Sequence, residues 1–366
     1  MYRIAVDARP LSFPTTGIGR YTQAILSRLV EQGWDWYLYS DRPLLWPEQL
    51  PENVRVRFPG FMPPAAGSFF SQLAYPVWCR KDKIDLFWSP RHHLPLLLGS
   101  GIRSVVTIHD LVWKRFPETM SRFGRILDAN LMPPSIRKAD GVISVSDSTT
   151  DEIQFICPEA DVTTIYEAPF LAPAEGCCEG DYFLFVGTLE PRKNLSNLLR
   201  AYRQCVKSCG EPLPLKICGG KGWGLPALQQ LIAELDLGAH VELLGYVPDT
   251  ELPGLYRNAR ALLMPSLYEG FGLPIVEAYS QNTPVVTSDR GAMREVAGDA
   301  ALLVNPESVE QMATALISLT QESDTVRSLQ QKARLRVQKF SWDSAAEQTL
   351  GLMESLLGRR FGHKSL

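Results

Sequence analysis

Two glutamates around one turn have the chemistry to bind a sugar that carries a phosphate. Glu269 and Glu277 stand in PSLYEGFGLPIVEAYS, residues 265–280. The apolar run at 261–264 predicts a buried parallel strand before the turn, and Pro274 suits the first turn of a following helix. Free N–H groups at such a helix start attract anions. Carboxylates beside an anion site are better suited to sugar hydroxyls, so the pattern indicates a nucleotide sugar. A plain strand-to-helix turn with a surface glutamate and a helix-start glutamate is the alternative.

Two cations stand at a second expected helix start. Arg192 and Lys193 follow an apolar run, residues 182–186, and precede a predicted helix that begins near Leu195. Cations at a helix N-terminus oppose the helix dipole, and a phosphate-bearing ligand would offset that cost. Solvated surface charge is the alternative interpretation of this pair.

The first half of the sequence offers a glycine turn and a histidine. Gly17 and Gly19 open a predicted helix, and Thr22 stands where a dinucleotide-binding loop would have its third glycine. A backbone that approaches a ligand is therefore favoured over a dehydrogenase, with a plain tight turn as the alternative. His109 follows a predicted strand, residues 103–108, at the end where ligands bind in open α/β sheets. It could donate to a sugar hydroxyl, or be an ordinary loop histidine.

Length and composition favour two globular domains. The chain has 366 residues, 45% of them hydrophobic, and a formal net charge of −3. A net charge this close to zero does not indicate a nucleic-acid-binding protein. Seven cysteines without a C-x-x-C pair favour a reducing compartment. No signal peptide is expected before the first strand, and no apolar run approaches 18 residues, so we expect a cytoplasmic protein.

The order of elements predicts an α/β architecture. Strand-like runs alternate with helical patterns in both halves, which predicts two doubly wound parallel sheets with helices on both faces. A stretch rich in small residues, Pro and Gly at 167–180 indicates the linker. The expected domains are residues 1–172 and 173–340. Residues 308–340 are expected to be helical.

The glutamate pair, separated by seven residues after a strand, resembles the signature of glycosyltransferase family 4, the retaining nucleotide-sugar transferases of GT-B fold. The similarity extends over nearly the whole chain. It implies two Rossmann-like domains facing a central cleft, with the acceptor bound by the first and the donor by the second. It also implies that residues 341–366 form a helix that crosses back onto the first domain. Thr188 departs from the pattern, because several relatives have arginine there.

The resemblance assigns roles to single residues. Glu277 would bind the ribose hydroxyls, Glu269 the donor sugar, and Arg192 with Lys193 the diphosphate, while His109 would lie near the donor sugar. The remaining groups expected to bind the donor are Gly17, Gly19, Tyr246, Val247, Gly270, Phe271, Gly272 and Leu273.

The expected chemistry is mainly electrostatic. When the anomeric bond breaks, the leaving diphosphate gains negative charge, and fixed donors and cations can stabilise it. The expected catalytic residues are His109, Glu269, Arg192 and Lys193. No two aspartates are spaced as D-x-D, and His92 and His93 are adjacent on an extended loop, where they make a poor metal pair. We therefore expect neither a metal nor a cofactor apart from the nucleotide-sugar co-substrate.

Three sequence segments, GIGRYT, HHLP and TIHDLVW, look like those of bacterial mannosyl- and rhamnosyltransferases that build O-antigen or other surface polysaccharide. This implies a GDP-linked hexose donor, mannose or rhamnose, and a saccharide acceptor carried on a lipid. Residues 68–83 and 114–138 combine apolar and basic side chains. Such segments suit peripheral contact with the inner face of the membrane, although core aromatics with solvated charges would give the same pattern.

Three other functions stay open. A hydrolase would use Glu269 and Glu277 as acid and base, but two carboxylates on one turn and helix would not normally flank a glycosidic bond. A nucleotide-sugar-binding subunit without turnover and a non-hydrolysing sugar-nucleotide epimerase are the other two.

Overall fold

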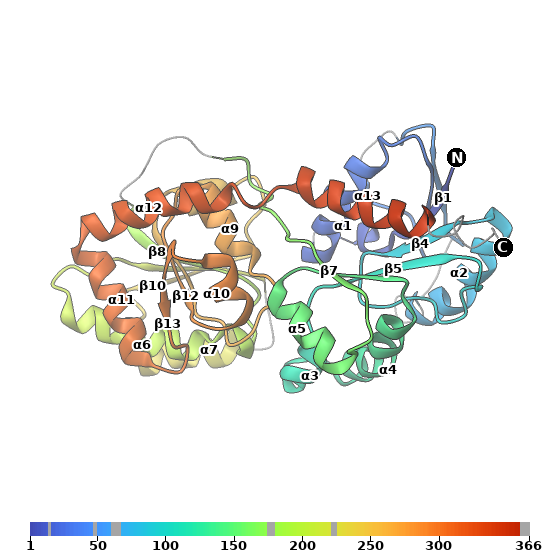
Figure 1. Ribbon diagram of the computed structural model, residues 1–366. Helices are drawn as coiled ribbons and strands as arrows, with labels where there is room; N and C mark the ends of the chain where they lie inside the picture. The colour runs from blue at the N-terminus through green and yellow to red at the C-terminus, as the bar shows by residue number, and fades with distance from the viewer. Residues whose placement is uncertain (14–15, 47–49, 60–66, 174–179, 221–224, 359–366) are drawn as a thin grey trace. The chain divides into compact units, whose positions relative to one another are not determined.

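The computed structural model describes residues 1–13, 16–46, 50–59, 67–173, 180–220 and 225–358. The chain divides into two compact units (Figure 1). Unit 1 comprises Met1–Glu167 together with Trp342–Leu366, and unit 2 comprises Ala168–Ser341. The division between the units thus falls at Glu167, within the segment that the sequence indicates as a linker. The C-terminal helix α13 (Trp342–Gly358) is part of unit 1.

The sheet of unit 1 is parallel throughout. Its described strands run in the order β3-β2-β1-β4-β5-β6-β7. These strands are β1 (Arg3–Asp7), β2 (Asp35–Tyr39), β3 (Val54–Arg57), β4 (Leu86–Ser89), β5 (Arg103–Ile108), β6 (Gly141–Ser144) and β7 (Val162–Thr164). The central strands β4 and β6 are buried along their whole length, as expected for a sheet covered on both faces.

Helices cover both faces of this sheet. On one face, Tyr21 of α1 (Gly17–Leu29) lies edge-on against Trp88 of β4 and Trp342 of α13. On the other face, Tyr75 of α2 (Gly67–Asp82) and Met132 of α4 (Arg122–Lys138) enter the buried core with the strands. The helices of unit 1 before α13 are η1 (Arg9–Ser12), α1 (Gly17–Leu29), α2 (Gly67–Asp82), α3 (Val112–Arg115), η3 (Pro117–Thr119), α4 (Arg122–Lys138) and α5 (Asp147–Ile156).

Unit 2 repeats the architecture with another parallel sheet. Its described strands run in the order β10-β9-β8-β11-β12-β13. They are β8 (Tyr182–Val186), β9 (Leu215–Cys218), β10 (Val241–Gly245), β11 (Ala259–Met264), β12 (Val285–Ser288) and β13 (Ala301–Val304). Helices α6, α7 and α11 share one core cluster with these strands.

The helices of unit 2 are η4 (Pro191–Lys193), α6 (Leu195–Ser208), α7 (Leu225–Glu234), α8 (Leu252–Arg257), α9 (Leu273–Ser280), α10 (Gly291–Ala297), α11 (Val309–Gln321) and α12 (Ser323–Val337). The helical stretch that the sequence predicts over 308–340 consists of two helices, α11 and α12. It is divided at Glu322, whose backbone is extended and whose carboxylate accepts hydrogen bonds from Ser318 and Thr325. Side chains that bind locally in this way compete with a helical backbone.

Each sheet has one point where the strand order reverses. In unit 1 the reversal lies between β1 and β4, and in unit 2 it lies between β8 and β11. Ligands of open α/β sheets bind outside the carboxyl ends of the strands at such a reversal. The loops that follow these four strands therefore have the best position for a site. The predicted class of two doubly wound parallel sheets is confirmed.

Candidate functional site

The residues predicted to bind the diphosphate meet in unit 2, at the reversal of its sheet. Glu269 lies in the loop after β11. Its Oε2 accepts a hydrogen bond from Nη1 of Arg192 at 2.7 Å, and its Oε1 accepts one from Nζ of Lys193 at 2.5 Å. Ser266 Oγ donates to Oε1 of the same carboxylate at 2.8 Å. Arg192 also binds Glu190 through Nε at 2.9 Å. One carboxylate thus holds both predicted cations.

Backbone and amide contacts fix the two loops to each other. Leu267 N donates to the carbonyl oxygen of Arg192 at 2.7 Å. Asn194, in the left-handed region at φ 61°, directs its side-chain amide to the carbonyl oxygens of Pro265 and Pro306. The turn that η4 makes before α6 therefore delivers the cations to the loop after β11. Sequence spacing could not reveal this pairing, because its members are more than 70 residues apart.

The charges of this cluster are balanced internally. Burial alone would raise the pKa of Glu269, but Lys193 and Arg192 lower it to about 2. Glu269 is therefore ionised at neutral pH and cannot supply a proton as a general acid. Arg192 and Lys193 carry two positive charges, and Glu190 and Glu269 carry two negative ones. A bound anion must consequently share the cations with Glu269.

The second glutamate of the signature is held separately. Glu277 lies on α9 and is buried, with Oε2 accepting a hydrogen bond from the hydroxyl of Tyr256 on α8 at 2.9 Å. Gly272 caps α9 at φ 104°, where a Cβ would lie 3.1 Å from Ile275. A glycine is therefore required at this turn for conformational reasons. The predicted residue Phe271 is buried, with its ring 5.8 Å from that of Phe340.

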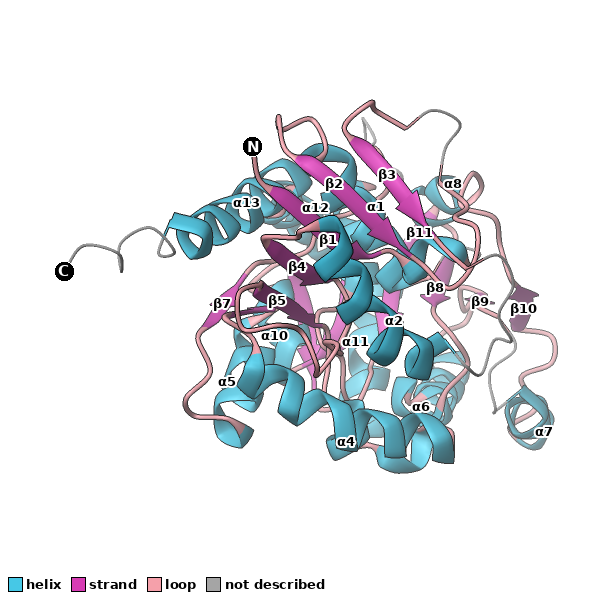
Figure 2. Cartoon of the chain, turned by 90° about the vertical axis from the view of Figure 1, so that its right-hand side faces the viewer, coloured by secondary structure: helices cyan, strands magenta, loops and turns pink. Residues whose placement is uncertain are grey.

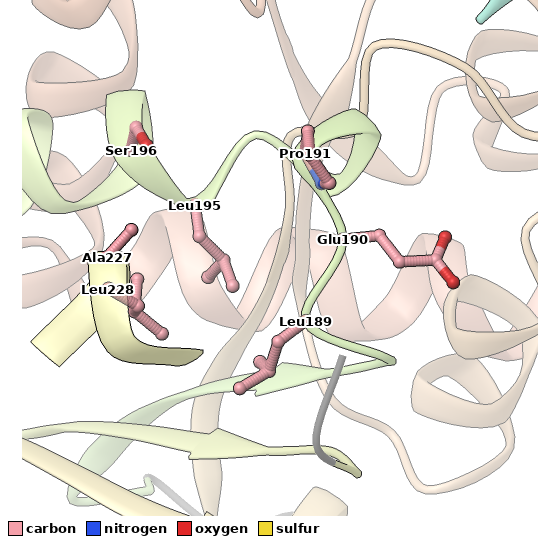
Figure 3. Close-up of a pocket in the computed structure, with 7 residues that line it drawn as sticks. All are labelled: Leu189, Glu190, Pro191, Leu195, Ser196, Ala227 and Leu228. Atoms are coloured by element: carbon pink, nitrogen blue, oxygen red, sulfur yellow. The ribbon is translucent and has the colours of Figure 1, made fainter. Parts of the chain in front are cut away.

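Two hollows of unit 2 lie beside predicted donor residues. Tyr246, 69% exposed, and Val247 follow β10 and line an open surface hollow together with Lys216. A second hollow, about 150 Å³, lies between the starts of α6 and α7 (Figure 3). It is lined by Leu189, Glu190, Pro191, Leu195, Ser196, Ala227 and Leu228. Because the lining is mainly aliphatic, this second hollow suits an apolar group rather than a diphosphate.

His109 in unit 1 has both ring nitrogens occupied. Nδ1 lies 3.0 Å from Oε1 of Glu167, and Nε2 lies 3.0 Å from the carbonyl oxygen of Pro90. A carbonyl oxygen only accepts, so Nε2 carries a proton. Burial would lower the pKa of His109, but the hydrogen bond and the charge of Glu167 outweigh it and raise the pKa. The sequence missed Glu167, which lies in the expected linker.

The glycine turn of unit 1 makes its contacts within its own loop. Thr16 caps α1 by accepting a hydrogen bond from Gly19 N at 3.0 Å. A Cβ on Gly19 would lie 2.9 Å from the carbonyl oxygen of Pro10, whereas a Cβ on Gly17 would meet no atom within 4 Å. The requirement for glycine at 19 is therefore explained without a ligand. In the described part of the chain, no cluster of three or more histidine, cysteine or acidic side chains could hold a metal ion.

Two family models match complementary parts of the chain. The model for glycosyltransferase family 4 matches residues 15–168, and the model for glycosyl transferases group 1 matches residues 179–336. The matched segments correspond closely to unit 1 and unit 2. Among the described helices, none is both long and apolar enough to cross a membrane.

Relatives and solved structures agree with these models. O-antigen chain mannosyltransferase B of Escherichia coli is 29% identical over 97% of this chain and 100% of its own length. O-antigen chain mannosyltransferase RfbU of Salmonella typhimurium is 29% identical over 69% of this chain and 70% of its own. The structure of sucrose-phosphate synthase from Thermosynechococcus elongatus matches with a TM-score of 0.80 at 21% identity, over 98% of this chain and 100% of that one. The chain is therefore a glycosyltransferase of GT-B fold and belongs to glycosyltransferase family 4.

Proposed function

We propose that the chain transfers a hexose, mannose before rhamnose, from a GDP-linked donor to a saccharide acceptor in O-antigen assembly. The observation that carries the proposal is the cluster of Arg192, Lys193 and Glu269 at the strand-order reversal of unit 2. The names of the two bacterial relatives support mannose as the sugar and O-antigen as the product. Retention of the anomeric configuration and independence of metal ions are part of the proposal.

In this proposal the donor diphosphate binds Lys193 and Arg192. Glu269 holds Lys193 through a single oxygen, and an ammonium group has three N–H donors, so the lysine can bind phosphate without leaving the carboxylate. As the anomeric bond breaks, these cations stabilise the charge that develops on the leaving phosphate. Glu269 stays ionised and accepts hydrogen bonds from hydroxyls of the donor sugar. The turn from Gly270 to Leu273 adds backbone N–H groups.

Glu277 is proposed to accept hydrogen bonds from the ribose hydroxyls of the donor. The hydroxyl of Tyr256 binds one carboxylate oxygen of Glu277 and thereby orients the carboxylate. Tyr246 and Val247 are proposed to contact the base, for which the exposed ring of Tyr246 offers a stacking surface. His109 remains a proposed catalytic residue of the acceptor-binding unit. To donate to a sugar hydroxyl, Nε2–H would have to break its hydrogen bond to the carbonyl oxygen of Pro90 and form one to the substrate.

Peripheral membrane contact is proposed for α2 and α4, the two helices that hold most of the predicted segments 68–83 and 114–138 (Figure 2). Phe69, Leu73 and Val77 recur every four residues along α2, and they are 70%, 52% and 57% exposed. Phe123 and Ile126 near the start of α4 are exposed as well. The neighbouring exposed bases are Arg80, Lys81, Lys83, Arg122 and Arg125. Apolar side chains flanked by bases suit an anionic lipid surface.

Vesicle sedimentation tests the membrane contact. The protein is expected to sediment with anionic vesicles at low salt and to be released as ionic strength rises. Replacing Arg80, Lys81 and Lys83 with glutamate should reduce this binding and leave donor affinity unchanged. Equal recovery with neutral and anionic vesicles, insensitive to salt, would contradict the electrostatic part.

A donor panel tests the transferase proposal. GDP, UDP, dTDP and ADP are compared by thermal shift, where a ligand at 100 times its Kd stabilises by about 2.7 kcal/mol. The matching nucleotide sugars are then assayed for sugar transfer and for hydrolysis. We expect the largest shift with GDP and turnover with GDP-mannose. Binding without any turnover would instead identify a nucleotide-sugar-binding subunit, and no nucleotide response at all would refute the proposal.

A further inference from the structure

The strand-order reversal of unit 1 is flanked by two arginines. Asp7 ends β1 and Arg9 follows it, while Arg91 follows β4, the neighbouring strand on the other side of the reversal. This is the position in unit 1 that corresponds to the Glu269 cluster in unit 2. The two arginines differ in their partners.

Each of the three guanidinium nitrogens of Arg9 donates a hydrogen bond. Nε and Nη2 bind the two carboxylate oxygens of Asp7 at 2.8 and 2.5 Å, and Nη1 donates to the carbonyl oxygen of Gly67 at 2.7 Å. Tyr75 adds a hydrogen bond to Asp7 at 3.4 Å. Arg9 is therefore a structural group, buried and neutralised within the fold.

Arg91 has no such partner. Its side chain is half-buried, and in the part of the chain that the structure describes no hydrogen bond or ion pair joins its guanidinium to another residue. Burial, and then the charge of Arg9, lower the pKa of Arg91, although Asp7 and Asp128 act in the opposite direction. A partly desolvated guanidinium with unused donors is costly unless an anion binds it.

A second unused group stands next to it. Nε2 of His92 is buried and has no hydrogen-bond partner. Burial lowers the pKa of His92 to about 4, so the ring is neutral at physiological pH and has one N–H to donate. His92 directly follows Arg91 in the loop after β4, and its ring lies 5.7 Å from that of His109. Buried polar groups normally have partners, and two unused ones together indicate a ligand.

We propose that Arg91, with His92 beside it, binds an oxyanion of the acceptor, either a phosphate ester or a carboxylate. The guanidinium fork can hold two oxygens of either group at once. The inference rests on the proposed transferase function, since it assigns the site to the acceptor. It adds the acceptor's charge as a determinant of specificity.

Calorimetry on the full chain tests the proposal with three probes, namely mannose 6-phosphate, glucuronate and neutral mannose. The variant Arg91→Gln should weaken binding of the anionic probe that fits by about tenfold or more. Arg55→Gln is the matched control, because Arg55 is an exposed arginine of the same unit that binds Tyr37. It should bind like the wild type. Which anionic probe binds more tightly distinguishes phosphate from carboxylate.

Two further variants separate this site from the donor site and from misfolding. Lys193→Ala should keep the affinity for the sugar anion and lose affinity for GDP, and Arg91→Gln should do the reverse. Arg91→Lys keeps the charge without the fork and should fall between wild type and Arg91→Gln. Failure of GDP to bind, with the sugar-anion results as expected, would count against the proposed function alone. The inference is overturned if no anionic probe binds, if mannose binds as tightly, or if Arg91→Gln has no effect.

Discussion

The two units place charged side chains at the same point of similar sheets but neutralise them differently. In unit 2, Arg192 and Lys193 are both held by Glu269. In unit 1, Arg9 is held by Asp7, while Arg91 has no partner among the residues that the structure describes. One site is complete without a ligand, and the other leaves a donor unused.

This difference has consequences for binding. A ligand of the unit 2 cluster must share the cations with a carboxylate, so a strongly charged anion such as a diphosphate is favoured. The internal pair also keeps the cations in place when no donor is bound. A ligand of Arg91 would displace no hydrogen-bond partner among the described residues. The two sites should therefore respond differently when their charged residues are neutralised.

The largest expected effect comes from Glu269→Gln. The variant leaves Arg192 and Lys193 without their shared carboxylate, which should lower the free energy of unfolding by roughly 3–5 kcal/mol. Urea unfolding followed by circular dichroism measures it. Glu190→Gln is the control, because it removes a more exposed partner of Arg192 and should cost about 1 kcal/mol or less. Equal losses of unfolding free energy in the two variants would contradict the view that Glu269 is the main partner of both cations.

Acid should erase most of the advantage of the wild type over Glu269→Gln. The pKa of Glu269 is about 2 in the folded chain, against 4.5 as its ordinary value. The corresponding stabilisation, about 3 kcal/mol, is fully present above pH 4.5 and is lost as pH falls towards 2. The difference in unfolding free energy between the two proteins should shrink when measured at pH 6 and then at pH 3. A difference in unfolding free energy that is the same at both pH values would mean that Arg192 and Lys193 do not lower the pKa of Glu269.

Glu277 and Tyr256 should produce graded effects on donor binding. Glu277→Gln removes the charged acceptor proposed for the ribose and should weaken GDP binding by about tenfold or more. Tyr256→Phe only loses the hydroxyl that orients the carboxylate and should cost about fivefold. Calorimetry with GDP measures both, with melting temperatures as the control. Loss of stability with unchanged affinity would assign Glu277 to structure alone.

Chelation should have the smallest effect. The proposed chemistry places cationic side chains where other sugar transferases use a metal. Transfer activity is therefore expected to survive EDTA after exhaustive dialysis. Loss of activity that Mn²⁺ or Mg²⁺ restores would show that a metal takes part.

The strands were the most predictable part of the molecule. The predicted strands at 103–108 and 182–186 agree with β5 and β8. Buried parallel strands appear as continuous apolar runs, which is a strong local signal. The sequence missed β7, because Val162–Thr164 is short, only partly buried and without such a run.

The contacts of the site could not be predicted in the same way. The residues of the family signature are visible in the sequence, but their partners are set by the meeting of distant loops. Lys193 with Glu269, His109 with Glu167, and Tyr256 with Glu277 are pairs of this kind. Likewise, Arg91 stands out only because the folded chain provides it with no partner.

Calorimetric titration of GDP-mannose into the wild type and into Lys193→Ala tests the central claim most directly. The claim is that the cations held by Glu269 form the donor diphosphate site. The variant should stay folded at the titration temperature, although it is less stable because Arg192 alone then faces both Glu190 and Glu269. It should bind GDP-mannose at least about tenfold more weakly. Equal affinity of the two proteins for GDP-mannose would contradict the account.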